Sequence, residues 1–336
     1  MDKLISVVVV NYNGAEFIAE CIDSVIKQTY TNWELIILDN NSTDNSIAII
    51  EEYPFVKLMK SNENLGFAKG NNMAIRQSKG DYVALLNNDA NADPDWLLKL
   101  FNMLESNSRL GSCACKIVSY YDPDIMDSAG LLIHPSGMSR GNGRAEPVSN
   151  YNITQKILIP SGCASMFRKK ALDEAGLFDE DFFCYCEDTD LGLRLQIFGW
   201  ECMYVSDAVV HHRYSATAGK YSLFKTYLVE RNHFWFVIKN FPMTMILMNP
   251  IHTVGLYLYQ LKDMLKQNGA ANELVNSYSK KKLVITILKA HRDVWKTVFV
   301  MLKKRREINK GKRVTNKQIK MWFNTYNINL KDLFKS

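Results

Sequence analysis

The sequence lacks both glycine-rich motifs that bind phosphate in the commonest nucleotide-binding proteins. No G-x-G-x-x-G follows the first apolar segment, and no G-x-x-x-x-G-K-[S/T] occurs in the 336 residues. In those motifs the glycines let the backbone approach a phosphate closely, so their absence argues against an ordinary dinucleotide dehydrogenase or a P-loop NTPase. The chain also has no internal repeat and no low-complexity linker.

The seven cysteines do not have the spacing of a zinc site. Cys113 and Cys115 are separated by one residue, as are Cys184 and Cys186, which is closer than structural zinc ligands usually stand. The first residues, 1–6, lack the basic, apolar and small-residue regions of a signal peptide. We therefore expect seven reduced thiols in a cytosolic protein.

No apolar run is both long and uninterrupted. Residues 243–261 approach the ~20 residues that a membrane span needs. However, Asn249, Pro250, His252 and Gln260 interrupt this run. We expect a core or interfacial helix here, with a membrane span as the alternative.

Positive charge is concentrated near the C-terminus. Residues 280–320 hold 15 Lys/Arg and 2 Asp/Glu, a net of +13, whereas the whole chain has +6, so the remainder carries −7. A basic segment on a mildly acidic body suggests an anionic partner surface, either a membrane or a nucleic acid. Residues 283–302 interleave apolar and basic side chains, a pattern compatible with a helix on a membrane or with an ordinary packed helix.

The N-terminal part alternates apolar strands with amphipathic helices. Strand-like apolar runs occupy 5–10, 33–38, 56–59 and 82–86. The intervening segments have helical periodicity or helix-start signals: 15–28, a helix capped by Ser42 or Thr43, a helix ending near 78–80, and one from Pro94. This order predicts a doubly wound α/β fold with a mostly parallel sheet.

The rest of the chain has a different sequence pattern, with shorter apolar runs and more turn residues. Turn-rich sequence over 111–159 predicts short antiparallel strands and a mobile loop at 139–149. We expect a strand and turn at 157–163, a short helix at 168–176, a helix at 191–198 capped by Asp188 or Thr189, and strands at 201–205 and 208–211. Three helices follow, at 221–239, 243–261 and 283–302.

Polar residues follow four of the predicted strands, after Val10, Leu38, Met59 and Leu86. The carboxyl ends of parallel strands share one edge of a sheet, which is where such sheets bind ligands. Asp89 stands at this edge, and a carboxylate there suits a hard divalent cation facing a diphosphate. The alternative is a turn at the strand end, since Asn and Asp favour turns.

Taken together in this order, the polar clusters resemble those of the family 2 glycosyltransferases, which have the GT-A fold. The matching segments are 7–13, 39–44, 64–72, 86–89, 161–163, 180–183, 187–191, and His212 with Ser215. The resemblance covers about residues 4–240 and is greatest to the rhamnosyltransferase-like branch, which builds bacterial or archaeal surface glycans. It implies a GT-A (Rossmann-like), doubly wound, mostly parallel sheet with a small antiparallel part. The catalytic domain would be residues 1–240, and 241–336 would be a basic helical C-terminal extension.

The resemblance also assigns a nucleotide site. Asp39 matches the carboxylate that accepts the imide N–H of uracil or thymine, and Gly66 would let the backbone approach the ligand. The alternatives are a helix cap for Asp39 and a helix-entry turn for residues 64–72. The full set of implied nucleotide-binding residues is Asn11, Asn13, Asp39, Asn64, Gly66, Asn72 and Asn88.

A divalent metal, Mn²⁺ or Mg²⁺, is implied at Asp89 and His212. The motif Asn87-Asn88-Asp89 has one carboxylate where the family pattern has two, which weakens the case for tight binding. His211 is the rival ligand, because neighbouring residues of a strand face opposite sides. The alternative is that both histidines are structural.

The resemblance makes Asp188 the catalytic base, with Glu187 as a second candidate or an acceptor-binding group. A single base and in-line attack give inversion at the anomeric carbon. Ser161, Gly162 and Cys163 are implied acceptor-binding residues. The cluster at 187–190 has the alternative of a helix capping box. Arg194 and Arg231 are candidates for phosphate contact or for solvated helix surfaces.

These expectations describe an inverting glycosyltransferase that moves rhamnose or another hexose from a dTDP- or UDP-sugar to a growing, lipid-linked surface glycan. It would be peripheral on the cytoplasmic face of the membrane and would bind no nucleic acid. One alternative is a glycoside hydrolase using Asp181 and Asp188. The other is a non-catalytic GT-A module that binds a nucleotide or a partner. No motif identifies the donor sugar, the acceptor or the oligomeric state.

Overall fold

The structure, a computed structural model, describes residues 3–213, 222–266 and 277–335. The chain divides into two units, which are considered separately. The first unit consists of residues 1–131 and 141–217, and the second of 132–140 and 218–336. The functional boundary expected at residue 240 remains a prediction.

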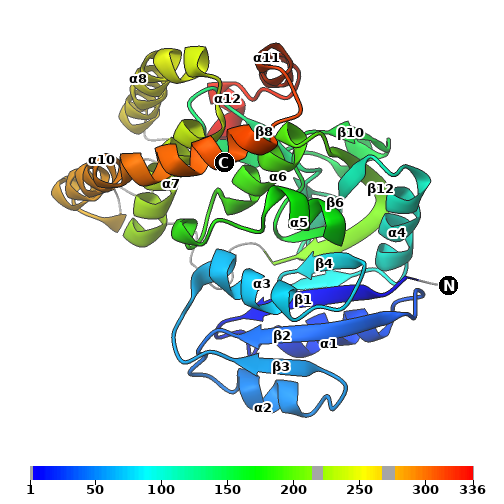
Figure 1. The fold of residues 1–336 in the computed structure, drawn as a ribbon. Helices are drawn as coiled ribbons and strands as arrows, with labels where there is room; N and C mark the ends of the chain where they lie inside the picture. Colours follow the sequence, from blue (N-terminus) through cyan, green and yellow to red (C-terminus); the bar gives the residue numbers. More distant parts are fainter. Residues whose placement is uncertain (1–2, 214–221, 267–276, 336) are drawn as a thin grey trace. The chain divides into compact units, whose positions relative to one another are not determined.

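The first unit is built on a ten-stranded sheet (Figure 1). Its N-terminal strands are β1 (Ile5–Asn11), β2 (Trp33–Asp39), β3 (Lys57–Lys60), β4 (Tyr82–Leu86) and β5 (Ala90–Ala92). The later strands are β6 (Leu110–Ser119), β7 (Met126–Ser128), β10 (Gln155–Ile157), β11 (Ala164–Arg168) and β12 (Glu201–His212). The order is β10-β12-β6-β11-β4-β1-β2-β3, with β5 on β12 and β7 on β6.

Alternate residues of the central strands face two hydrophobic cores. Val7 and Val9 of β1 belong to one core, together with α1 (Ile18–Ile26) and α4 (Trp96–Ser106). Val8 belongs to the other, with α3 (Gly66–Arg76), α5 (Lys169–Ala175) and α6 (Glu187–Ile197). Helices therefore cover both faces of the sheet, and the continuous β-branched run of β1 is buried on both sides. The predicted doubly wound α/β fold is confirmed.

The strand order reverses between β1 and β4. β1 pairs in parallel with β2 on one side and with β4 on the other, and β2 pairs in parallel with β3. Such a reversal is where open α/β sheets bind ligands, at the carboxyl ends of the strands. Asn11 ends β1, Asp39 ends β2, and Asn88 and Asp89 follow β4, so the predicted polar edge lies at this position.

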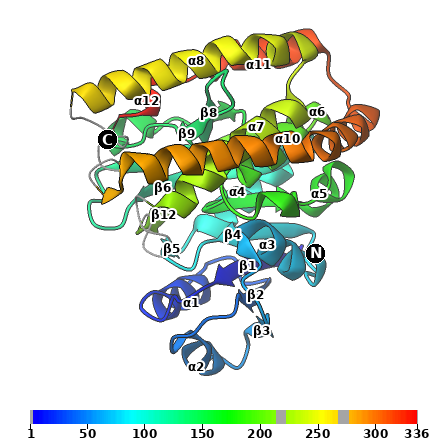
Figure 2. The same cartoon turned by 90° about the vertical axis from the view of Figure 1, so that its left-hand side faces the viewer.

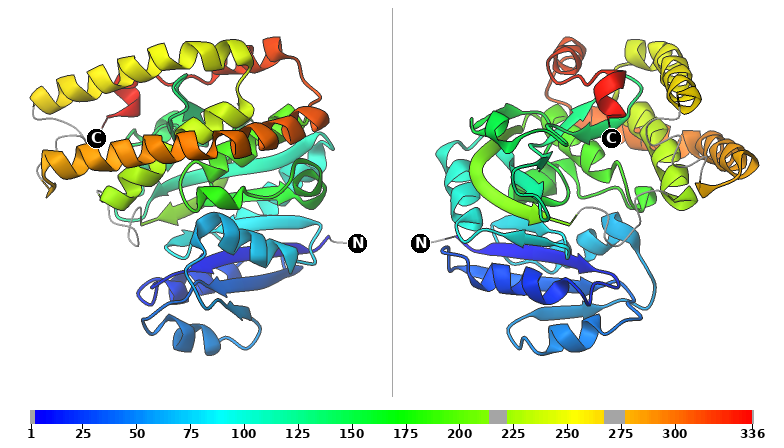
Figure 3. Two further views of the ribbon diagram at one scale, coloured as in Figure 1. Left: turned by 60° about the vertical axis from the view of Figure 1, so that its left-hand side comes forward. Right: turned by 180° about the vertical axis from the view of Figure 1, so that it is seen from behind.

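Several predicted boundaries are wrong. The strands expected at 201–205 and 208–211 are one strand, β12, with a register shift between Val205 and Val209. Figure 3 shows its strong curvature in lime. β11 was not predicted. The expected mobile loop at 139–149 contains β9 (Ser139–Gly141), which forms a two-stranded sheet with β8 (Leu131–Ile133), and it ends in the 3-10 turn η1 (Val148–Tyr151).

Two helices start away from their predicted caps. The short helix α2 (Ser46–Glu51) begins after Asn45, so neither Ser42 nor Thr43 caps it. α6 begins at Glu187, four residues before the predicted start at 191. Its N-cap, Cys186, has a left-handed backbone conformation with φ 67°. Asp188 therefore lies inside the first helical turn. The seven cysteines are all free thiols, as predicted.

The second unit is helical. Its helices are α7 (Leu223–Asn240), α8 (Met243–Leu265), α10 (Lys280–Gly311), α11 (Asn316–Thr325) and α12 (Leu330–Leu333). Figure 2 shows that α8 and α10 are long and run in opposite directions, and Figure 3 shows α10 along α7. Among the described residues, no helix combines the length and the hydropathy that a membrane span requires.

Candidate functional site

A chain of hydrogen bonds joins the ends of three neighbouring strands. The Asn88 side chain donates to Asn11 Oδ1 at 2.9 Å, and the Asn11 side chain donates to Asp39 Oδ1 at 3.0 Å. All three side chains are buried. A Cβ at Gly14 would stand 2.2 Å from the Asn88 amide nitrogen, so only glycine fits beside this chain. Three of the predicted nucleotide-binding residues are therefore brought together at the point where the strand order reverses.

Asp39 is held by backbone and side-chain donors. Its second oxygen accepts a hydrogen bond from the Ser42 N–H at 2.9 Å. Asn13, with φ 49°, reaches the same turn, and its side-chain oxygen accepts from the Thr43 N–H at 2.8 Å. The helix-cap alternative for Asp39 is wrong, because α2 begins only at Ser46. A carboxylate has about four lone-pair sites, so Asp39 can still accept a further N–H.

The segment after β3 is fixed by Asn40. The Asn40 amide donates to Asn64 Oδ1 at 3.0 Å, and its oxygen accepts from the Leu65 N–H at 2.7 Å. Gly66 has φ 71°, and a Cβ there would stand 2.5 Å from the carbonyl oxygen of Phe183. Glycine at position 66 therefore lets the backbone lie close to Phe183, in the segment before α6. Whether the Gly66 backbone also approaches a ligand remains a prediction.

Asn72 joins α3 to the same region. Its amide donates to the Phe178 carbonyl at 2.8 Å and to Glu180 Oε1 at 3.0 Å, and its oxygen accepts from the Phe178 N–H at 3.0 Å. The side chain thus positions the segment that carries η2 (Glu180–Phe182). Its predicted role in nucleotide binding remains untested.

Asp89 faces His212, and His211 points elsewhere. His212 Nε2 lies 3.3 Å from Asp89 Oδ1, and its Nδ1 lies 2.6 Å from Asp127 Oδ2. His211 Nε2 instead lies 3.2 Å from Asp93. The pairing of β12 with β5 places His212 opposite Ala90 and explains this choice, because neighbours in a strand face opposite sides.

The His212 imidazole is oriented by carboxylates on both nitrogens. Burial disfavours its charged form, but Cys163, Asp127 and Asp89 outweigh this, and the pKa of His212 is raised well above its usual range. Asp127 is in turn paired with Arg144 at 2.7 Å. A carboxylate on one ring nitrogen, with the other nitrogen beside a second carboxylate, is the arrangement that holds a metal-binding histidine in place.

Asp89 and His212 fit a divalent cation whose remaining ligands would come from a substrate. Asp89 Oδ1 and His212 Nε2 converge, and both side chains are buried. Within the described ranges, no group of three or more His, Cys, Asp and Glu side chains could hold an ion by itself. Mn²⁺ and Mg²⁺ are commonly held by one or two protein ligands together with substrate phosphates. Asp89 and His212 could therefore supply part of the coordination of such an ion.

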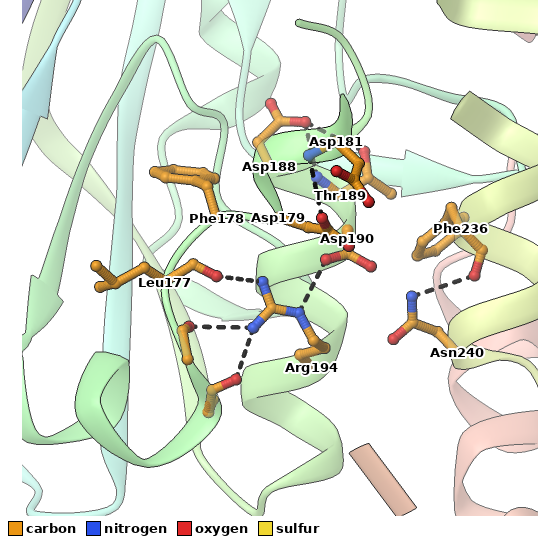
Figure 4. Close-up of polar contacts among 12 residues, drawn as sticks. Leu177, Phe178, Asp179, Asp181, Asp188, Thr189, Asp190, Arg194, Phe236 and Asn240 are labelled. Atoms are coloured by element: carbon orange, nitrogen blue, oxygen red, sulfur yellow. Dashed lines mark hydrogen bonds and ion pairs between the residues drawn. The ribbon is translucent and has the colours of Figure 1, made fainter. Parts of the chain in front are cut away.

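Two adjacent acidic residues open α6. Asp188 accepts a hydrogen bond from the Gly162 N–H at 3.0 Å. It also accepts one from the Thr189 N–H at 2.7 Å (Figure 4). Burial raises the pKa of Asp188, while these donors lower it in part. Burial and the neighbouring Asp188 raise the pKa of Glu187 well above its usual range. Glu187 Oε2 is buried and has no hydrogen-bond partner in the described part of the chain. Burial and Asp188 therefore favour the protonated form of Glu187, whereas Asp188 has hydrogen-bond donors that favour its ionised form.

Residues 161–163 lie between Asp89 and the two acidic residues that open α6, Glu187 and Asp188. Gly162 donates to Asp188, and a Cβ there would stand 3.2 Å from the Asp188 Cβ. The Cys163 carbonyl accepts from the Asn87 N–H at 2.8 Å, and its thiol contacts His212. Ser161 Oγ accepts from the Cys163 N–H at 3.3 Å. This turn therefore links Asp89 and His212 to the carboxylates of α6.

Neither sequence interpretation of Arg194 is right. Arg194 is buried, and its guanidinium donates to Asp190 at 2.8 Å. It also donates to the carbonyl oxygens of Ala175, Gly176 and Leu177 at 2.6, 3.0 and 2.6 Å (Figure 4). The side chain is occupied in fixing α6 and is neither solvated nor directed at phosphate. In the second unit, Arg231 stacks on the ring of Trp235 at 4.0 Å.

Sequence reasoning missed the residues that support Asp89 and His212. Arg213 donates from its backbone to the Asp89 carbonyl at 3.1 Å and from its side chain to Glu20 at 2.6 Å. Its guanidinium lies over Tyr120 at 3.6 Å. Asp127 lies 85 residues from His212 in the sequence. Such long separations leave no local pattern by which these partners could be found. Ser215, part of the resemblance, lies outside the described residues.

Comparisons of the sequence with known proteins find one family. A sequence model of a family described as glycosyl transferase family 2 matches residues 6–176. An uncharacterised glycosyltransferase of Haemophilus influenzae is 35% identical over 222 residues, covering 62% of this chain and 65% of the relative. The N-acetylglucosaminyl-diphospho-decaprenol L-rhamnosyltransferase of Mycobacterium tuberculosis is 29% identical over 244 residues, 65% of this chain and 78% of that protein. The chain thus spans less than two thirds of the length of the Haemophilus relative.

Solved structures show the same fold. The crystal structure of GalNAc-T7 with UDP, GalNAc and Mn²⁺ superposes with a TM-score of 0.59 at 16% identity, covering 70% of this chain and 48% of that one. This neighbour has the GT-A fold, with the mixed sheet and covering helices described above. At this identity the likeness concerns the fold alone.

Proposed function

The chain belongs to glycosyltransferase family 2, and from this premise we propose that it transfers a hexose, rhamnose or another, with inversion from a dTDP- or UDP-sugar to a hydroxyl of a lipid-linked surface glycan. The observation that carries the proposal is the convergence of Asp39, Asp89 and Asp188 around the point where the strand order reverses. The hydrolase alternative is set aside, because Asp181 is exposed whereas Asp188 is half-buried and bonded to Gly162.

The donor nucleotide would lie across the ends of β1, β2 and β4. Asp39 keeps acceptor capacity beyond its bonds to Asn11 and Ser42, so it can receive the imide N–H of uracil or thymine. The rhamnosyltransferase relative supports a deoxysugar donor and a polyprenyl diphosphate acceptor as the first to test.

The diphosphate would lie beside Asp89 and His212. These two side chains would hold Mn²⁺ or Mg²⁺, which offsets the charge that develops on the diphosphate leaving group. Asp127 fixes the ring of His212 through its 2.6 Å contact, and Arg144 holds Asp127. These two side chains behind the pair hold the His212 ring with its Nε2 toward Asp89.

The acceptor hydroxyl would lie at the start of α6. Asp188 removes its proton as the new C–O bond forms, because an unassisted hydroxyl has a pKa far too high to attack. A protonated Glu187 can donate to another acceptor oxygen, which gives a role to its Oε2, an atom that has no hydrogen-bond partner among the described residues. Attack from this side, opposite the leaving diphosphate, inverts the anomeric centre.

A transfer assay with matched carboxylate variants tests the proposal. The purified chain is given dTDP-rhamnose or UDP-hexoses with a polyprenyl-diphosphate N-acetylglucosamine acceptor, and release of nucleoside diphosphate is measured. Asp188→Asn is expected to bind nucleotide normally and to lose about a hundredfold to ten-thousandfold in rate. Asp181→Asn, a neighbouring exposed carboxylate, is expected to keep its rate. Equal loss in both variants, or full activity of Asp188→Asn, would overturn the assignment.

We place the enzyme on the cytoplasmic face of the cell membrane, where a lipid-linked acceptor would meet it. The support is the basic segment 280–320, since anionic lipid attracts each nearby Lys or Arg by ~1 kcal/mol.

A further inference from the structure

We propose that α8 and α10 of the second unit form a lipid-contact surface, in which exposed apolar side chains of both helices enter an anionic bilayer interface and the cations of α10 bind its headgroups. The inference extends the proposed function, because a lipid-linked acceptor gives this surface its purpose. The surface is defined here by Leu247, Ile251, Val254, Leu258 and Leu265 of α8 and by Val284, Leu288, Trp295 and Phe299 of α10.

The exposed face of α8 is apolar along almost its whole length. Leu247, Ile251, Val254, Leu258 and Leu265 are 72, 63, 56, 61 and 76% exposed. Their spacing of three, four or seven residues places them on one side of the helix. From Leu247 to Leu265, a separation of 18 residues, this stripe is ~27 Å long. Residues 243–261 contain no Asp, Glu, Lys or Arg, so the stripe from Leu247 to Leu258 has no charged neighbour within the helix turns that it spans, and Lys262 and Asp263 follow only before Leu265.

The opposite side of α8 is fixed to its own unit. Leu256 is fully buried, and the Asn249 side chain donates to the Pro135 carbonyl at 3.0 Å. Tyr257 bonds His291 of α10 at 2.8 Å, and both contact Glu230 of α7. The apolar stripe is therefore the side of α8 that the described residues of the unit leave exposed.

α10 presents aromatic side chains among cations. Its packed side carries Ala290 and Met301, both fully buried. Trp295 and Phe299 are 76 and 81% exposed. Leu288 lies about two helical turns before Trp295 and so on the same side of the helix.

The charge of α10 is strongly positive. Residues 280–311 contain eleven Lys/Arg and two Asp/Glu. The two acids are engaged, Asp293 by the Tyr227 hydroxyl at 2.8 Å and Glu307 by Lys310 at 2.8 Å. Large aromatic and aliphatic side chains flanked by Lys and Arg are typical of helices that lie in a membrane interface.

The charge decides between a membrane and a second copy of the chain. Soluble monomers rarely expose apolar patches larger than a few hundred Å². A symmetric dimer through this surface would set the same basic helix against itself, because a two-fold interface uses the same patch on both subunits. An anionic bilayer instead complements both the cations and the apolar side chains. The surface therefore fits lipid better than a self-complementary protein contact.

Vesicle binding of the full-length chain tests the inference. Co-sedimentation is measured with vesicles of phosphatidylcholine alone and of phosphatidylcholine with phosphatidylglycerol. The double variants Trp295→Ser/Phe299→Ser and Leu258→Ser/Leu265→Ser each remove two exposed side chains, and Tyr121→Ser removes an exposed aromatic of the first unit as a control. We expect binding to the anionic vesicles, a loss of about tenfold or more in each double variant, and no loss in the control.

Further measurements distinguish a failure of the lipid-contact inference from a failure of the proposed function. Each variant is checked for unchanged circular dichroism, and nucleotide binding is measured on the same samples, since it tests the proposed function without lipid. Vesicle binding that is absent in the wild type, or undiminished in both double variants, would overturn the inference even if nucleotide binds. A wild-type dimer in sedimentation velocity that the double variants convert to monomer, without vesicle binding, would instead assign the surface to a second copy of the chain.

Discussion

Arg194→Met is expected to be among the most destabilising single substitutions in the first unit. The guanidinium makes four hydrogen bonds, one to Asp190 and three to consecutive backbone carbonyls before η2. Asp190 is fully buried, and removing Arg194 takes away the cation that pairs with its carboxylate. Breaking a buried pair in this way costs roughly 3–5 kcal/mol. For a unit of about two hundred residues, this lowers the melting temperature by roughly 6–20 °C.

Differential scanning calorimetry measures this change in melting temperature. Two further variants test whether the change comes from the buried pair of Arg194 and Asp190. Arg109→Met removes an arginine whose side chain is 72% exposed and lies 3.8 Å from Glu201, so it should cost about 0–1 kcal/mol. Arg194→Met/Asp190→Leu removes both charges and should recover part of the loss. If Arg194→Met melted within about 2 °C of the wild type, this account of α6 would be refuted.

Three other predictions concern buried carboxylates. Because burial raises the pKa of Asp188, kcat/KM should fall as acid protonates it, at a pH above the ordinary aspartate range; a limb at or below that range would contradict its role as base. The folded chain favours protonated Glu187, so its contribution to stability is lost as pH rises above 4.5, the usual glutamate pKa. Glu187→Gln should therefore have a melting temperature no lower than that of the wild type at about pH 8. Any increase in its melting temperature should disappear at about pH 4, where the wild-type carboxyl is protonated. A melting temperature below that of the wild type at pH 8 would contradict this. Glu230 behaves oppositely: burial raises its pKa, but contacts with His233, His291 and Tyr257 outweigh this and hold it well below the usual value. Glu230→Gln should cost the second unit about 3 kcal/mol at neutral pH, and urea unfolding should show the difference from the wild type shrinking below pH 4.5; a constant difference would contradict it.

The sequence predicts the N-terminal half of the fold well because its signals there are local. The apolar run at 5–10 becomes β1, with one residue added, and its two-sided burial follows from the unbroken β-branched pattern. The polar residues after β1, β2 and β4 converge as expected, because parallel strands end at a common edge. The choice between His211 and His212 needed the structure, since alternation alone does not say which of two neighbours faces the site.

The errors arise where a local signal competes with tertiary contacts. Ser206 and Asp207 interrupt the apolar pattern of β12 and suggest two strands, but Thr154 bonds Ser206 at the irregularity and the strand continues. Asp188 and Thr189 have the composition of a helix cap, yet the left-handed Cys186 starts α6 earlier. The contact between Asp127 and His212 joins residues far apart in the sequence, so no local spacing could predict it.

The central claim is that the strand ends bind a nucleoside diphosphate through a divalent ion at Asp89. The most direct measurement is the melting temperature of the chain with dTDP or UDP, each with and without Mn²⁺, in the wild type, Asp89→Ala and Asp93→Ala. The control Asp93 is the neighbouring carboxylate that contacts His211 instead. A ligand that binds only the folded state raises the melting temperature. The account predicts a rise that requires both nucleotide and Mn²⁺, persists in Asp93→Ala and disappears in Asp89→Ala. A rise that is independent of Mn²⁺, that survives in Asp89→Ala, or that is absent from the wild type would contradict it.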